Sequence, residues 1–125
     1  MKKEVIEAYE KLDVQIEGLH KEISIISKKS PNDALNKFKL RFVNQILSEV
    51  NKILDKKYVP FDDFACFEED DVPTNSDVVI VLTQYISCLE KFKFDNVEFK
   101  LTDWYWKTEE GIGIKTSRPP LKFTY

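Results

Sequence analysis

The sequence predicts an α+β protein in which a three-helix N-terminal bundle is followed by a small C-terminal antiparallel β-meander. Up to residue 94 the apolar side chains recur at helical spacing, whereas from residue 97 onward apolar and polar side chains alternate. A chain of 125 residues can bury one core without disulfides or metals, so we expect a single domain, 1–125. The expected elements are helices at about 3–29, 32–57 and 75–94, an acidic connector at 58–73 and a β-meander at about 97–125.

A regular apolar seam predicts the first helix, residues 3–29. Its members are spaced alternately by four and three residues, which places them along one side of a helix. Two uses of such a seam stay open: packing against the other helices of the same chain, or self-association into a homo-oligomer. The seam consists of Val5, Tyr9, Leu12, Ile16, Leu19, Ile23 and Ile26.

The second helix is predicted to begin at about residue 32. Pro31 suits the first helical position, and Ser30 before it with Asp33 after it resembles a capped N-terminus. A broad apolar stripe then runs between residues 35 and 54. Pro60 disfavours helical backbone in the residue before it, so we expect the helix to end at about residue 57.

The acidic connector, residues 58–73, combines carboxylates with regularly spaced phenylalanines. Six acids and no base lie between Asp62 and Asp71, and three phenylalanines recur every third residue, which predicts a short helical turn pinned by aromatic side chains. Three interpretations stay open: a solvated loop, a surface for a basic protein partner, and a Mg²⁺ or Ca²⁺ site, which the absence of calcium-loop spacing disfavours. The candidate partner-binding residues are Phe61, Asp62, Asp63, Phe64, Phe67, Glu68, Glu69, Asp70 and Asp71.

The third helix, 75–94, holds the longest apolar run of the chain and is expected to be a buried central rod. The residues around Thr74 form a start signal, and the side chains are apolar on most sides of the helix. The β-branched residues between 78 and 82 also suit a strand. A narrow polar strip that continues at helical spacing favours the helix, and it comprises Thr83, Gln84, Ser87 and Lys91.

The C-terminal alternation predicts strands. Val97, Phe99 and Leu101 alternate with charged residues, Glu110 and Gly111 suit a hairpin turn, and residues 121–125 suit a last edge strand. The two tryptophans share one face of a strand and are expected to cover the helices as core. Two alternatives stay open: a protein interface, and a nucleic-acid-binding module in which aromatic and basic side chains stack on bases and hold phosphates. The candidate residues of the nucleic-acid alternative are Trp104, Tyr105, Trp106, Lys107, Lys115, Arg118 and Lys122.

No catalytic motif is evident, so we expect a protein that is not an enzyme and needs no cofactor or metal. The chain has one histidine, His20, which excludes sites that need two, and its three glycines form no phosphate-binding loop. No apolar run reaches membrane-spanning length and the N-terminus is unlike a signal peptide, which together predict a cytoplasmic protein.

The density of interface-type residues favours a non-enzymatic protein–protein interaction module. Sixteen aromatic side chains and a sustained heptad seam are typical of protein interfaces, and a net charge of −3 gives little attraction to nucleic acid. We expect an accessory subunit or an inhibitor of a larger protein, and a phage or bacterial conflict system suits such a chain. The expected partner is a protein, with a basic surface if the acidic connector binds it.

Overall fold

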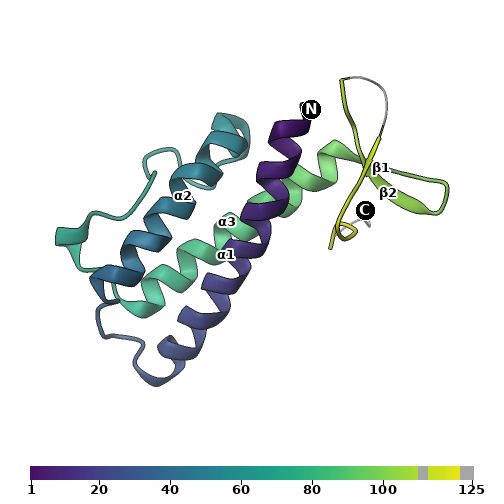
Figure 1. Cartoon of the computed structure of the whole chain (residues 1–125). Helices are drawn as coiled ribbons and strands as arrows, with labels where there is room; N and C mark the ends of the chain where they lie inside the picture. Colours follow the sequence, from purple (N-terminus) through teal and green to yellow (C-terminus); the bar gives the residue numbers. More distant parts are fainter. Residues whose placement is uncertain (110–112, 122–125) are drawn as a thin grey trace.

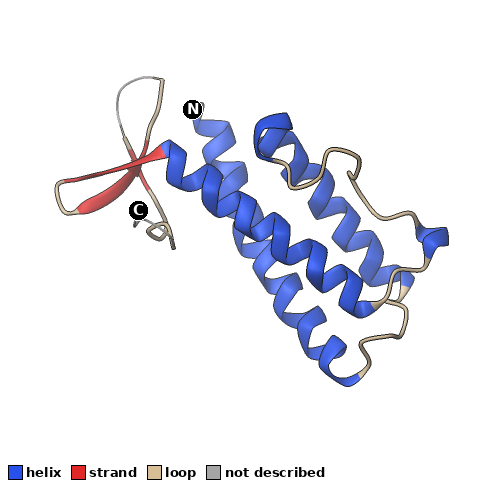
Figure 2. Ribbon diagram, turned by 180° about the vertical axis from the view of Figure 1, so that it is seen from behind, coloured by secondary structure: helices blue, strands red, loops and turns tan. Residues whose placement is uncertain are grey.

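A three-helix bundle with a small sheet at one end forms the structure (Figures 1 and 2), as the sequence predicts. This computed structural model describes residues 1–109 and 113–121. The sheet is antiparallel, with strand order β1-β2-β3. The elements are α1 Lys3–Lys29, α2 Lys37–Tyr58, the 3₁₀ turn η1 Glu69–Asp71, α3 Asn75–Asn96, β1 Val97–Lys100, β2 Asp103–Trp106 and β3 Ile114–Lys115.

The core lies where the three helices face one another. Helix α1 runs opposite to both α2 and α3, because the connector returns the chain to the same end of the bundle before α3 begins (Figure 1). Ile16, Leu47 and Leu82, one from each helix, are completely buried. Burying such an aliphatic side chain stabilises the fold by about 2 kcal/mol.

The heptad seam of α1 faces into this core. Tyr9, Leu12, Ile16 and Ile23 are buried, and the other three seam residues are half-buried. Tyr9 also contacts the sheet, because its ring lies 4.9 Å from that of Trp106 and its hydroxyl donates to the Leu89 carbonyl at 2.7 Å. Of the two uses that the spacing allows, the structure has the seam packed within the chain.

The predicted start of the second helix is wrong by about five residues. Helix α2 begins at Lys37 with Asn36 as its N-cap, whose side chain accepts a hydrogen bond from the Lys39 amide. Residues 31–35 instead lie against the segment before α3, where the Leu35 amide donates to Pro73 and the Asn75 amide donates to Asp33. These long-range bonds satisfy backbone groups that a longer helix would have paired internally.

Helix α3 is a helix through residues 78–82, as the polar strip predicts. Thr74 forms a capping box with Asp77, which satisfies two backbone donors at the N-terminus. The helix is less buried than the sequence predicts, since Ile80 is 60% exposed. Helices α1 and α2 cover only part of its circumference, which leaves an apolar residue facing outward.

Strand β1 ends earlier than the alternation of apolar and polar residues predicts. Leu101 belongs to a two-residue turn with Thr102, and both have positive φ, at 52° and 68°, as in the tight turns that match the twist of a hairpin. Leu101 is 84% exposed, so burial does not hold it in a strand. The expected turn at residues 110 and 111 and the expected last strand lie wholly or mainly outside the described residues.

One residue of α2 has an unfavourable backbone conformation. Asp55 has φ 55° and ψ −176°, a region that glycine alone adopts readily. We expect Asp55→Gly to raise the free energy of unfolding by about 1 kcal/mol, measured by urea denaturation. Asp55→Ala is the control, since it removes the same side-chain carboxylate but still disfavours this backbone conformation. Equal stability of the two variants would contradict the interpretation that the backbone at residue 55 is strained.

Candidate functional site

The acidic connector is fixed to the bundle by its phenylalanines. The rings of Phe61, Phe64 and Phe67 pack edge to face in a row, with centroids 5.8 and 5.1 Å apart, and Phe64 also contacts Tyr85 of α3 at 6.5 Å. The predicted helical turn over these residues is wrong, because the one described turn of helix in the connector is η1. Contacts with the bundle, and not local helical bonds, hold the aromatic row.

Two asparagines of α2 clamp the connector backbone. Asn44 donates to the Phe67 carbonyl and accepts from the Phe67 amide, both at 2.9 Å. Asn51 donates to the Ala65 carbonyl at 2.8 Å and accepts a bond from the Tyr85 hydroxyl. Sequence reasoning missed both asparagines, although their seven-residue spacing places them on one side of a helix.

The connector carboxylates face outward from this fixed backbone. Five of the six acids are exposed, and the half-exposed Glu69 accepts a 3.2 Å ion-pair hydrogen bond from Arg41 of α2. Arg41 lies within one helical turn of Phe38 and Phe42 in α2; these two side chains are 68% and 46% exposed, and their ring centroids are 5.0 Å apart. We call the acids the acidic ridge, which comprises Asp62, Asp63, Glu68, Glu69, Asp70 and Asp71.

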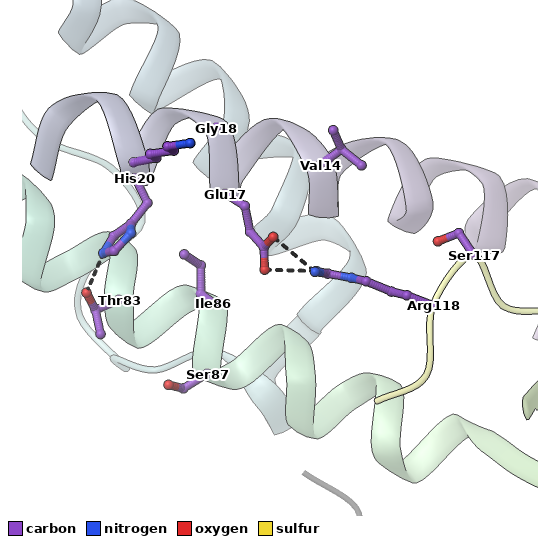
Figure 3. A pocket seen from close by; sticks show the side chains of 10 residues that line it. Val14, Glu17, Gly18, His20, Thr83, Ile86, Ser87, Ser117 and Arg118 are labelled. Atoms are coloured by element: carbon purple, nitrogen blue, oxygen red, sulfur yellow. Dashed lines mark hydrogen bonds and ion pairs between the residues drawn. The ribbon is translucent and has the colours of Figure 1, made fainter. Parts of the chain in front are cut away.

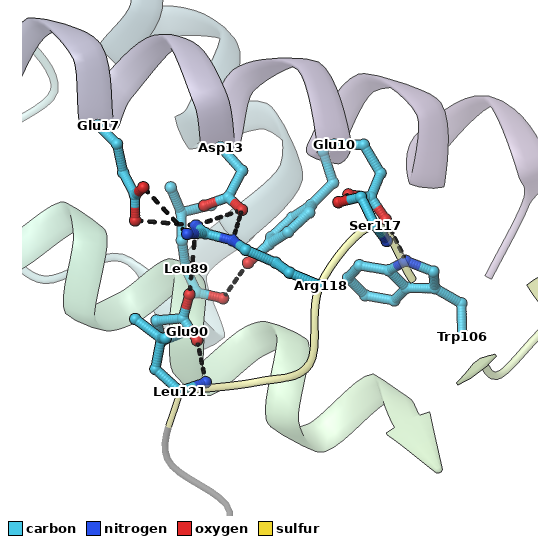
Figure 4. Close-up of polar contacts among 10 residues, drawn as sticks. Glu10, Asp13, Glu17, Leu89, Glu90, Trp106, Ser117, Arg118 and Leu121 are labelled. Carbon is cyan, nitrogen blue, oxygen red and sulfur yellow. Dashed lines mark hydrogen bonds and ion pairs between the residues drawn. The ribbon is translucent and has the colours of Figure 1, made fainter. Parts of the chain in front are cut away.

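A second charged site joins α1 and α3 to the C-terminal segment (Figure 4). Glu10, Asp13 and Glu17 follow one face of α1, and Glu90 of α3 lies opposite them. We call these four residues the carboxylate cradle. Asp13 and Glu90 are buried, whereas Glu10 and Glu17 are half-buried.

Arg118 occupies the centre of the cradle. Its guanidinium donates to Asp13 Oδ2 from Nε at 3.2 Å and from Nη2 at 2.7 Å, and to Glu17 from Nη1 at 3.1 Å and Nη2 at 2.8 Å. Glu90 Oε1 lies 3.8 Å from Nη2. Such forked, charge-assisted bonds are the strongest that a carboxylate makes with a side chain.

The cradle also binds the backbone beside Arg118. Glu10 accepts hydrogen bonds from the Ser117 amide and hydroxyl and from the Trp106 indole, the last at 2.8 Å. Glu90 Oε2 accepts the Leu121 amide at 3.0 Å. Residues 117–121 are therefore held along α1 and α3 by the four carboxylates.

Arg118 stands where a metal ion would be coordinated. Oxygen atoms of Asp13, Glu17 and Glu90 lie within 4.8 Å of one another, which is close enough to hold a cation. The guanidinium of Arg118 contacts the same three carboxylates. Arg118 therefore supplies the positive charge that these three carboxylates require.

Burial and ion pairing shift the pKa values of the cradle residues in opposite directions. Burial raises the pKa of Asp13 above its ordinary value, against the hydrogen bonds and positive charge of Arg118. Burial lowers the pKa of Lys93, whose ammonium group is attracted by Asp13, Glu10 and Glu90. Lys93 is completely buried, and its Nζ has no hydrogen-bond partner in the described part of the chain.

Glu10 makes the stability of the fold depend on pH in the acidic range. Burial alone raises its pKa, but hydrogen bonds from Ser117 and Trp106 outweigh burial and hold the pKa below the ordinary 4.5. A carboxyl group with a lowered folded pKa contributes stability that is complete above 4.5 and is lost as the pH falls through the folded value. We therefore expect Glu10→Gln to lose less stability than the wild type between about pH 5 and pH 3, measured by urea unfolding. The exposed Glu7→Gln is the control, and an equal loss in all three proteins would contradict the assignment.

A groove of about 640 Å³ continues from the cradle between α1 and α3 (Figure 3). Thr83 donates its hydroxyl hydrogen to the Val79 carbonyl, so it accepts the 3.0 Å bond from His20 Nε2. His20 therefore joins α1 to α3. His20 itself is half-exposed. The groove residues include Val14, Glu17, Gly18, Ile86, Ser87 and Arg118.

The residues of the nucleic-acid alternative do not form one open platform. Trp106 is completely buried, and half-buried Trp104 packs against Phe99 with ring centroids 5.3 Å apart. Lys115 pairs with Asp103 at 3.4 Å, and Arg118 lies in the cradle. Half-buried Tyr105 lies 5.8 Å from the Lys100 ammonium, Lys107 is exposed, and Lys122 is outside the described residues.

Comparison of the chain with protein-family models, with curated proteins and with solved structures finds no match. Among the helices that the structure describes, none has the length and apolar character to cross a membrane.

Proposed function

We propose that the chain is a non-enzymatic protein-binding module whose acidic ridge and neighbouring Phe38–Phe42 pair bind a basic surface of a partner protein. The observation that carries the proposal is the fixed connector. Phenylalanines and two asparagines attach its backbone to the bundle, while five of its six carboxylates stay exposed. An accessory subunit or an inhibitor of a larger protein is the role that suits such a module.

The two parts of the surface have different tasks. Exposed carboxylates attract a basic partner and speed the encounter, an effect that salt screens. Exposed aromatic residues supply the apolar contact that most interfaces concentrate in a few anchors. The Arg41–Glu69 ion pair joins the ridge to the turn of α2 that carries both phenylalanines, so one partner can contact both.

A connector with a fixed backbone binds a partner more favourably than a flexible acidic loop would. A mobile segment loses conformational freedom when it binds, whereas the connector is already ordered by the clamps of Asn44 and Asn51. The acidic connector is therefore prepared for binding at little entropic cost. Self-association through the heptad seam is no part of the proposal, because that seam packs within the chain.

Neutralising four acids of the ridge tests the proposal. We expect Glu68→Gln, Glu69→Gln, Asp70→Asn and Asp71→Asn together to leave the fold intact and to slow association with a basic partner captured from the native host. The loss should be at least tenfold in the association rate at low salt and should shrink as salt rises, measured by surface plasmon resonance.

A matched control separates the ridge from net charge. The quadruple change Glu4→Gln, Glu7→Gln, Glu22→Gln and Glu49→Gln removes the same charge from exposed helix positions and should leave the association rate nearly unchanged. Phe38→Ala with Phe42→Ala should chiefly speed dissociation. Equal effects of both quadruple variants would contradict the proposal.

A further inference from the structure

We infer that the carboxylate cradle is a recognition site for an arginine-bearing, proline-rich segment of a partner protein, and that residues 117–121 are its resident ligand. The site lies on the α1 and α3 side of the bundle and is independent of the acidic ridge. Figure 4 shows the segment lying across the two helices with Arg118 pointing into the cradle.

The segment is held as a bound peptide is held. In the described part of the chain, the hydrogen bonds of residues 117–121 go to side-chain carboxylates of the cradle, and none joins their backbone to another backbone. Pro119 and Pro120 have no amide hydrogen to donate and favour an extended backbone. Every described bond that fixes the segment could therefore be made equally well by a segment that is not part of this chain.

The cradle recognises three features of its ligand. Asp13 and Glu17 bind the guanidinium with four hydrogen bonds, Glu10 binds a residue with both a hydroxyl and an amide, and Glu90 binds the amide three residues after the arginine. Pro120, between these anchors, is buried. A lysine could not make the forked bonds, because its ammonium group is a single donor centre.

The cradle needs a guanidinium ligand even when Arg118 is removed. Asp13 is 2% exposed and Glu90 is 7% exposed, and in the described part of the chain the positive charge left beside them is that of Lys93. Glu90 Oε1 is already without a hydrogen bond in the described residues, although it faces Arg118. Among the described residues, losing the guanidinium would leave Lys93 as the cation beside two buried carboxylates, a state that strongly favours an incoming guanidinium.

The resident segment also acts as a competitor. A tethered ligand has an effective concentration in the millimolar range, so a partner segment binds the wild type weakly until residues 117–121 are displaced. Removing the resident guanidinium should therefore raise the affinity of the cradle for an external ligand.

The test uses the full-length chain and a peptide. The probe is the N-acetylated, C-amidated peptide with the sequence of residues 116–121, and the control peptide has citrulline in place of arginine. We expect Arg118→Ala to bind the arginine peptide at least tenfold more tightly than the wild type does, measured by isothermal titration calorimetry. Neither protein should bind the citrulline peptide, because citrulline lacks the charge.

Further variants locate the bound peptide. Arg118→Gln keeps a longer side chain and serves as a second background in case the alanine variant unfolds. Adding Asp13→Asn to either background should abolish binding, whereas adding the ridge changes at residues 68–71 should leave it unchanged. The ridge is itself acidic, so this control separates specific recognition from general attraction to basic peptides.

Three results would overturn the inference. One is a folded Arg118 variant that does not bind the arginine peptide at millimolar concentration, which would make the cradle a closed ion-pair network. Another is equal binding by the wild type and the variant, which would place the peptide elsewhere. The third is a wild-type dimer that excess peptide converts to monomer, since the occupant would then be the same segment of a second copy and not a partner protein.

Discussion

Replacing Arg118 by alanine is expected to lower the free energy of unfolding by about 3 kcal/mol, because it leaves the buried Asp13 and Glu90 without their guanidinium partner. Removing one member of a buried ion pair typically costs about 3–5 kcal/mol, and the lower value applies because the Arg118 side chain is one-third exposed. Urea denaturation at neutral pH measures the change.

Lys115→Ala is the matched control for this experiment. Lys115 is close to Arg118 in the chain and also pairs with an acid, Asp103, but both partners are well exposed. Exposed pairs contribute about 0–1 kcal/mol, so this change should be nearly silent. An Arg118→Ala variant that loses no more unfolding free energy than Lys115→Ala would contradict this expectation. Burial would then not strengthen the ion pairs of the cradle, and residues 117–121 would be only loosely attached.

Replacing Trp106 by alanine is expected to cost about 4 kcal/mol, the largest effect of any change in the sheet. Trp106 is completely buried, and its ring packs 4.9 Å from that of Tyr9. Its indole also donates to Glu10 at 2.8 Å, so the substitution would both open a cavity and leave a carboxylate oxygen with one donor fewer.

Phe99→Ala is the control for Trp106→Ala. Phe99 belongs to the same small sheet but is 60% exposed, so its removal should cost less than about 1 kcal/mol. Fluorescence gives a second measurement, because the buried Trp106 should emit at shorter wavelength than a solvated indole and resist quenching. Similar costs for the two variants would contradict the role of Trp106 as the residue that joins the sheet to α1.

Local patterns in the sequence determined the architecture. The spacing of Tyr9, Leu12 and Ile16 predicts an amphipathic helix, and the change from helical to alternating spacing near residue 97 marks the start of the sheet. The heptad spacing did not decide between internal packing and self-association, because both bury the same side of a helix. The partial exposure of Ile80 likewise depends on which neighbours cover α3.

The tertiary structure alone decided the start of α2 and the existence of the carboxylate cradle. Helix α2 starts late because residues 31–35 bond to residues near 73–76, and no local pattern reports a partner so far along the chain. Glu10, Asp13 and Glu17 share a helix face in the sequence, but an amphipathic helix normally presents such acids to solvent. Their partner Arg118 is 105 residues from Asp13, and only folding brings the two charges together. Periodicity is set by backbone geometry over a few residues, whereas a charge acquires its partner and its burial from the path of the whole chain.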